Sequence, residues 1–117
     1  MSQNEYEKAV DLFSQGKRQE AADALKKIIV NEPSNADAYE SLGMVYYKMG
    51  QLDEAIAWTE KLAALKPEHA MAHTNLSVFY MKKGDNERAE VEKAKAVVLN
   101  FSSAKEHGGL KRNNDEK

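Results

Sequence analysis

The chain has 117 residues, with 17 Lys and Arg against 19 Asp and Glu, no Cys and a formal net charge of −2. This nearly balanced charge argues against a nucleic-acid-binding surface, and the absence of Cys excludes disulfides, thiolate metal ligands and Cys nucleophiles. No apolar run approaches the roughly 20 residues that a membrane span needs, and the N-terminal residues lack the features of a secretory signal. We therefore expect one soluble domain in the cytoplasm that binds neither nucleic acid nor a membrane.

The sequence contains an internal repeat of 34 residues. Gly16, Gly50 and Gly84 recur at this interval. Three further columns of residues keep the same interval: Leu12, Tyr46 and Tyr80; Ala21, Ala55 and Ala89; and Ile28, Leu62 and Ala96. Because a fixed period of this length indicates a repeat architecture, we divide the chain into three units, 2–35, 36–69 and 70–103, and a tail, 104–117.

Each unit is predicted to form two helices. In the second unit, apolar residues from Tyr39 to Tyr47 recur at steps of three and four residues, which is the pattern of one helix face. The pattern breaks at Gly50, resumes at Leu52 and stops before Pro67, because Gly can end a helix in a left-handed conformation and Pro cannot continue one. A single helix pair cannot bury its apolar faces alone, so we expect the units to stack in an all-α array.

The last helix is predicted to be longer than its counterparts. Phe101 stands where the first two units have Pro33 and Pro67, so the stop signal is missing there. We expect the helix to continue through Ser102–Ala104 to Lys105 or His107 and to end at Gly108–Gly109, since two Gly after a basic turn favour a helix stop. The rest of the tail is polar, and we expect it to be flexible.

A 34-residue helix–turn–helix unit with these residues resembles the tetratricopeptide repeat (TPR). The resemblance covers residues 2–103 and is fullest in the second unit, at Tyr39, Leu42, Gly43, Tyr46, Gly50, Ala55, Leu62 and Pro67. It implies a right-handed α-solenoid of three helix pairs, with a concave groove lined by the first helix of each unit. It also places small residues where paired helices approach most closely, namely Ala9, Gly43 and Ser77 with Ala21, Ala55 and Ala89.

The sequence favours a non-enzymatic chain without metal or cofactor. His69 and His73 lie four residues apart, a spacing at which two His can share a metal, but no third ligand lies nearby in the sequence. Asp53 and Glu54 fall at a predicted helix start, where carboxylates favour the helix dipole without a catalytic role. The chain contains no Ser nucleophile motif and no phosphate-binding Gly-rich loop. We therefore expect no catalytic residue, no metal ion and no cofactor.

The resemblance implies that a partner protein binds in the concave groove. The groove positions that we select on this chain are mostly apolar: Tyr6, Val10, Phe13, Glu40, Met44, Tyr47, Met71, Asn75, Val78 and Met81. Aromatic and Met residues are usual anchors of protein-binding surfaces, and an apolar groove suits an amphipathic helix or an apolar peptide segment. The alternative interpretation is that several of these residues, Phe13 and Tyr47 above all, pack between repeats.

The acidic C-terminal peptide of a heat-shock chaperone is not the expected partner. The resemblance implies that TPR proteins which bind such a tail hold it with a clamp of Lys, Asn and Arg. The five corresponding positions here are Tyr6, Val10, Ser41, Met71 and Asn75, so no basic clamp residue is present. We therefore predict an adaptor for a different kind of segment.

Self-association is the alternative function. The stretch Val91–Phe101 holds more apolar residues than one inward-facing stripe needs. Val97 and Val98 are adjacent, about 100° apart on a helix, so they belong to different faces, and we expect one of these faces to be partly exposed. Either the extended helix and Leu110 shield it, or a second copy covers it. We predict a weak homodimer through Val97, Val98 and Phe101.

Overall fold

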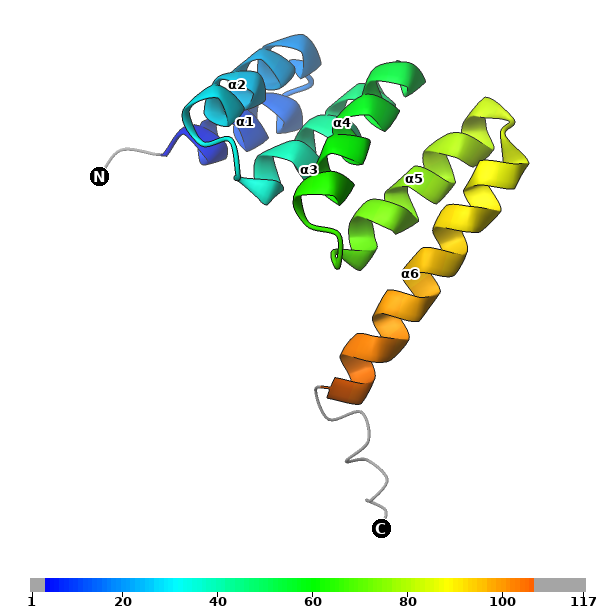
Figure 1. Cartoon of the computed structure of the whole chain (residues 1–117). Coiled ribbons are helices and arrows are strands. Elements are labelled where there is room, and N and C mark those ends of the chain that lie inside the picture. Colours follow the sequence, from blue (N-terminus) through cyan, green and yellow to red (C-terminus); the bar gives the residue numbers. More distant parts are fainter. Residues whose placement is uncertain (1–3, 107–117) are drawn as a thin grey trace. The chain divides into compact units, whose positions relative to one another are not determined.

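The computed structural model describes residues 4–106, and this part of the chain forms helices joined by short turns (Figure 1). The helices are α1 (Glu5–Ser14), α2 (Arg18–Asn31), α3 (Ala36–Lys48), α4 (Leu52–Leu65), α5 (Ala70–Lys83) and α6 (Asn86–Glu106). The predicted all-α fold of successive helix pairs is confirmed. The expected helix stop at Gly108–Gly109, Leu110 and the rest of the tail from residue 107 lie outside the described residues.

The helices belong to two compact structural units. From here on, "unit" refers to these two, and the three 34-residue segments of the sequence are called repeats. The first unit is Met1–Pro67 and contains α1–α4, and the second is Glu68–Lys117 and contains α5 and α6. Within the units, consecutive helices pack as antiparallel pairs: α1 with α2, α3 with α4, and α5 with α6 (Figure 1). No helix in the described part of the chain is both long enough and apolar enough to cross a membrane.

The same turn ends the first helix of every pair. Gly50 has φ +77°, in the left-handed region that residues with a side chain rarely adopt, and the next residue donates its backbone N–H to the Tyr46 carbonyl oxygen over 2.9 Å. Gly16 and Gly84 have φ +82° and +89°. The prediction that the Gly column ends the first helices is therefore confirmed.

Small residues allow the helices of a pair to approach closely. A Cβ atom on Gly43 of α3 would overlap Thr59 Oγ1 of α4 and would lie 3.6 Å from the Ala55 carbonyl oxygen. The Thr59 hydroxyl donates to that same carbonyl oxygen over 2.7 Å, which satisfies a hydroxyl that is buried in the interface. In the second unit, the Ser77 hydroxyl of α5 donates to the Ala89 carbonyl oxygen of α6 over 2.8 Å. Of the predicted close-approach residues, Gly43, Ala55, Ser77 and Ala89 thus lie between the paired helices, and Ala9 and Ala21 are buried.

In the first unit, α3 packs against α2 as well as against α4, and so joins the two helix pairs. Leu25 and Ile28 of α2 and Leu42 of α3 are buried in this core. The Lys26 ammonium lies 5.4 Å from the centre of the Tyr46 ring, and its hydrogen bond with Tyr46 is the main reason why the pKa of Lys26 is raised, against a smaller opposing effect of burial. Apolar packing and this polar contact together fix α3 on α2.

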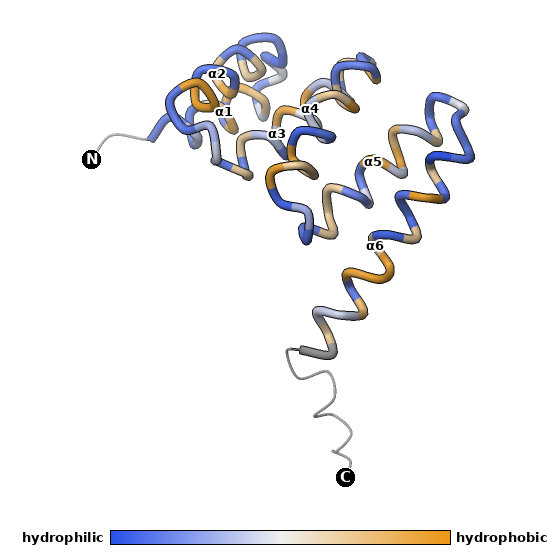
Figure 2. Tube along the Cα trace, viewed as in Figure 1, coloured by the Kyte–Doolittle hydropathy of each residue, from blue (hydrophilic) through white to orange (hydrophobic). Residues whose placement is uncertain are grey.

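The last helix is extended, as predicted. α6 runs past Phe101 and includes Ser102–Ala104. Its most covered residues recur at steps of three and four and form a stripe that contains two Ala, a Glu and a Leu: Ala89, Glu92, Ala96 and Leu99. Strongly apolar residues are present along the middle of α6 (Figure 2), and Val91, Val97 and Val98, which lie outside this stripe, are exposed.

Candidate partner-binding groove

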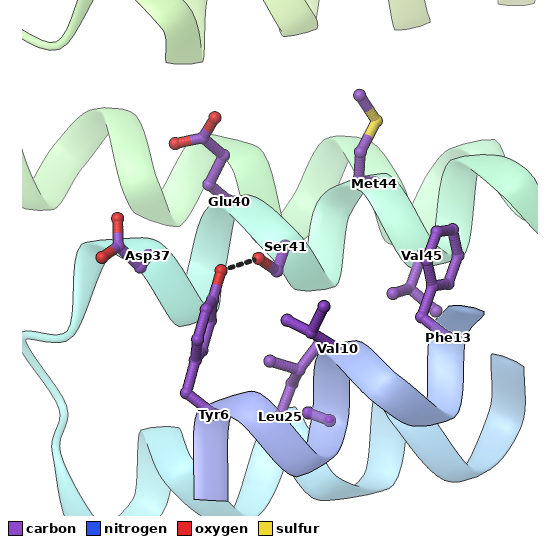
Figure 3. Close-up of a pocket in the computed structure, with 10 residues that line it drawn as sticks. Tyr6, Val10, Phe13, Leu25, Asp37, Glu40, Ser41, Met44 and Val45 are labelled. Atoms are coloured by element: carbon purple, nitrogen blue, oxygen red, sulfur yellow. Dashed lines mark hydrogen bonds between the residues drawn. The ribbon is translucent and has the colours of Figure 1, made fainter. Parts of the chain in front are cut away.

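The first unit contains an open and mainly apolar pocket between α1, α2 and α3, which we call the α1–α3 pocket. Its volume is about 350 Å³. Five of the ten predicted groove residues surround it. The full lining is Tyr6, Ala9, Val10, Phe13, Leu25, Asp37, Glu40, Ser41, Met44 and Val45 (Figure 3).

One hydrogen bond connects α1 to α3 across the pocket. The hydroxyl oxygen of Tyr6 lies 2.6 Å from Ser41 Oγ, and either group can donate (Figure 3). Phe13 lies near Val45 at the opposite end of α1 in the same view. The polar pair and the aromatic ring therefore mark the two ends of the pocket, and the space between them is lined by Val10 and Leu25.

The lining combines exposed walls with a buried floor. Val10 keeps 42% of its surface exposed and Met44 keeps 38%, whereas Leu25 keeps 2%. Phe13 is half-buried, which agrees in part with the packing interpretation. Because Val10 and Met44 stand on well-formed helices that are packed in the unit, a partner can contact them without a large rearrangement of the backbone.

The charged lining of the α1–α3 pocket is entirely acidic. Asp37 and Glu40 line it from the start of α3, and no Lys, Arg or His does. Asp37 is exposed and Glu40 is half-buried. This arrangement favours a ligand that carries positive charge beside its apolar groups.

The other predicted groove residues lie outside this pocket. Tyr47 is half-buried on α3. In the second unit, Met71, Val78 and Met81 of α5 are 47%, 41% and 50% exposed, whereas Asn75 is buried. Sequence reasoning did not separate the buried Asn75 from the exposed Met and Val because all of them lie on the same predicted face.

His73 of α5 is buried. Its Nδ1 atom lies 2.7 Å from Glu92 Oε1, and the two side chains are 10% and 14% exposed. Lys95 contacts the other carboxylate oxygen of Glu92 over 3.3 Å, and His69 is the N-cap residue of α5. Within residues 4–106, no three His, Asp or Glu residues are grouped as a metal site would require.

Both valine faces of α6 are exposed, which exceeds the single exposed face expected from the sequence. Val97, Val98 and Phe101 keep 60%, 62% and 67% of their surface exposed. The reason is that the covered stripe of α6 passes through Glu92 and Ala96 and leaves both Val residues beside it.

Sequence reasoning missed the floor of the α1–α3 pocket. Ala9, Leu25 and Val45 line it, and only Ala9 was marked from the sequence, as a small residue where paired helices approach. Their spacing along the chain indicates burial, but it carries no signal that a buried residue also borders an open cavity.

Comparison with known proteins supports the TPR assignment. A family model described as tetratricopeptide repeat matches residues 6–68. No curated protein sequence matches the chain significantly. Among solved structures, a crystal structure of MamA is 34% identical, with a TM-score of 0.84, and the match covers 86% of this chain and 59% of that chain.

Two more distant structures share the fold. The Yersinia enterocolitica type III secretion chaperone SycD, in complex with a peptide of the translocator YopD, is 23% identical, with a TM-score of 0.79 over 87% of this chain and 79% of that chain. The second TPR of Spaghetti (RPAP3), bound to the HSP90 peptide SRMEEVD, is 19% identical, with a TM-score of 0.76. The match covers 81% of this chain and 88% of that chain.

The extent of each match shows how much of this chain the family assignment covers. This chain spans about three fifths of the MamA structure that it resembles. The family model covers more than half of this chain and includes both helix pairs of the first unit. The chain belongs to the tetratricopeptide repeat family.

Proposed function

We propose that this chain is a non-enzymatic, cytoplasmic adaptor whose α1–α3 pocket binds an amphipathic helix or an apolar segment of another protein. The observation that carries the proposal is the pocket itself, an open cavity of about 350 Å³ with Tyr6, Val10, Phe13 and Met44 in its walls. Burial of a partner's apolar side chains against such walls supplies roughly 25 cal/mol per Å² of surface removed from water.

The comparisons support a peptide ligand for this fold. SycD is solved with a YopD peptide, and the second TPR of RPAP3 is solved with an HSP90 peptide. Both peptides are ligands of those two proteins. For this chain they support the class of ligand, a segment of another protein, and the pocket residues supply the argument for its chemistry.

The lining of the pocket argues for a partner with basic residues beside its apolar stripe. Asp37 and Glu40 supply negative charge at the pocket. Tyr6, Val10 and Ser41 stand where a clamp for an acidic tail needs basic or amide side chains, and Tyr6 and Ser41 are hydrogen-bonded to each other. An acidic peptide would meet like charge in this lining, and none of the lining residues is basic, so we exclude the chaperone tail from the proposed partners.

Substitution of Met44 tests the proposal. Met44→Glu places a carboxylate in the apolar wall, and we expect it to abolish capture of the partner because a charge buried without a counter-charge is strongly unfavourable. Val30→Glu is the matched control, since Val30 is 78% exposed on α2 and does not line the pocket. Affinity capture with quantitative mass spectrometry should recover proteins with the unmodified chain and Val30→Glu that Met44→Glu loses.

Two results would contradict this proposal. One is a Met44→Glu chain that loses its helical circular dichroism or its thermal transition, because Met44 would then belong to the core. The other is a folded Met44→Glu chain that captures the same proteins as Val30→Glu. An unchanged helical spectrum together with lost capture is the expected combination.

A self-associating scaffold is the second candidate function. The observation that favours it is the exposure of Val97, Val98 and Phe101, each more than half exposed on α6. Burial of these side chains against a second copy would remove apolar surface from water. We propose a weak homodimer as this alternative, formed through the C-terminal half of α6.

Light scattering after size-exclusion chromatography separates the two candidates. A dimer through α6 predicts a mass that rises with concentration in the unmodified chain and a monomer in the variant Val98→Lys with Phe101→Lys. Val30→Lys is the control for an added Lys on an exposed apolar position. A chain that is monomeric at high micromolar concentration before any substitution would rule out the dimer.

A further inference from the structure

The second unit has a pocket of its own, between α5 and α6, with a volume of about 530 Å³. We call it the α5–α6 pocket. Its apolar lining includes Val78 and Met81 of α5 and Ala96 and Val97 of α6, and Lys82 and Lys93 also line it. No acidic side chain lines this pocket, so its charge is opposite to that of the α1–α3 pocket.

The repeat register identifies the counterpart of this pocket in the first unit. Two repeat lengths separate Met81 from Phe13 and Lys93 from Leu25. Phe13 and Leu25 line the α1–α3 pocket, whose third wall is α3. The α5–α6 pocket is therefore the equivalent of the surface of α1 and α2 on which the next helix of the array, α3, packs.

Within the described residues of the second unit, 68–106, no segment packs on the α5–α6 pocket as α3 packs on the first pair. In the first unit, α2 ends at Asn31 and the chain turns before α3 begins at Ala36. The equivalent residues of the second unit, 100–103, lie within α6, which continues through them. Among residues 68–106, the described part of the second unit, no helix therefore occupies the position equivalent to α3.

The charge of the pocket indicates what kind of helix fits it. Lys93 replaces Leu25 of the first unit, and Lys82 replaces Ser14. Both lysines are exposed. A helix that packs here as α3 does would place its own residue equivalent to Val45 beside the Lys93 position, because Val45 lines the first pocket together with Leu25. A carboxylate at that point would pair with the Lys93 ammonium.

We propose that the α5–α6 pocket binds an amphipathic helix of another protein that packs as α3 packs on α1 and α2 and carries Glu or Asp opposite Lys93. The apolar stripe of this helix contacts Val78, Met81 and Ala96. The proposal does not depend on the α1–α3 pocket, because the two pockets lie in different units and select ligands of opposite charge.

Two synthetic peptides serve as probes. Both are N-acetylated and C-amidated and have the sequence of residues 36–48, the α3 helix, one unchanged and one with Val45→Glu. Each is titrated into the ¹⁵N-labelled full chain, and amide chemical shifts are followed by NMR. The proteins are the unmodified chain, Lys93→Leu, which restores the residue type of the first unit, and Lys27→Leu as a control on an exposed lysine of α2.

We expect both peptides to shift amides of residues that line the α5–α6 pocket. For each protein, we compare the Kd of the Val45→Glu peptide with the Kd of the unchanged peptide. This ratio should be about three times smaller for the unmodified chain than for Lys93→Leu, because the carboxylate forms a solvent-exposed ion pair only with Lys93. Lys27→Leu should behave like the unmodified chain. Comparison of the effect of the peptide substitution in the two proteins separates the carboxylate–Lys93 contact from the apolar contribution to binding.

Four outcomes would overturn the proposal. The first is an absence of amide shifts in the α5–α6 pocket at millimolar peptide, and the second is an equal effect of the Val45→Glu change on binding to the unmodified chain and to Lys93→Leu. The third is a shift of the pocket amides when the chain is diluted without peptide, and the fourth is a displacement of the resonances of residues 107–117 by the peptide. The third would identify a second copy as the occupant, and the fourth would identify the chain's own tail.

Discussion

The hydroxyl groups of Tyr6 and Ser41, 2.6 Å apart, connect the first helices of two successive repeats. A shift by one repeat length places Glu40 and Asn75 at the corresponding positions, so this pairing of two hydroxyl groups is particular to the first two repeats. It lies at one end of the α1–α3 pocket and links α1 to α3 (Figure 3).

Removal of either hydroxyl tests this connection. Tyr6→Phe and Ser41→Ala should each lower the free energy of unfolding by about 0.5–1.5 kcal/mol, the usual net contribution of one hydrogen bond. The double variant should lose less than the sum, because the second substitution removes a hydroxyl that already lacks its partner. Urea denaturation of the four proteins measures this, and strictly additive losses would show that the two groups do not interact in solution.

Gly43 and Thr59 should be sterically coupled. Gly43→Ala places a methyl group against Thr59 Oγ1, and we expect a loss of about 1–3 kcal/mol from overpacking. Gly43→Ala combined with Thr59→Ala should lose less than the sum of the two single variants, since the shorter side chain leaves room for the methyl group. Thermal melts with a double-mutant cycle measure the coupling.

Gly16 provides the control for that cycle. A Cβ atom at this position would have nothing within 4 Å, but the φ of Gly16 is +82°. Gly16→Ala should therefore lose about 1–2 kcal/mol through backbone strain alone, and Thr59→Ala should not relieve that loss. Equal relief of both Gly variants by Thr59→Ala would contradict the close approach of α3 and α4.

The pair of His73 and Glu92 should be interdependent. His73→Phe supplies the kind of aromatic side chain that the second repeat has in Tyr39, but it removes the partner of Glu92 Oε1 on a side chain that is only 14% exposed, while Lys95 still contacts the other carboxylate oxygen. We expect a loss of about 1–3 kcal/mol, the cost of leaving a buried acceptor without its donor. Glu92→Leu in the His73→Phe background should recover stability, whereas further destabilisation would show that Glu92 is hydrated without His73. Chemical denaturation at neutral pH measures all three variants.

The fold could be predicted from the sequence because the repeat columns report burial directly. Ala55 and Leu62 are fully buried, and Gly50 has the left-handed conformation expected of a residue that ends a helix. The extension of α6 followed from Phe101 in the place of a Pro. These are local signals, in which one residue type at one position decides between continuing and ending a helix.

The candidate site could be predicted only in part. Val10 and Met44 were identified as groove residues, but the buried floor at Leu25 and the pairing of Glu92 with His73 depend on contacts between different helices. The same limit explains α6, where the count of apolar residues favoured a buried Val and the covered stripe instead passes through Glu92 and Ala96. A one-dimensional pattern gives the face of a residue but not what covers that face.

Site-specific photo-crosslinking at position 44 is the most direct test of a partner-binding α1–α3 pocket. A photoreactive amino acid is incorporated at Met44 and, as the control, at Val30, which is exposed on α2 away from the pocket. We predict that irradiation in cell extract covalently links a different protein to position 44 and not to position 30. Crosslinks from position 44 only within the same chain, or equal yields of the same product from both positions, would contradict a partner-binding pocket.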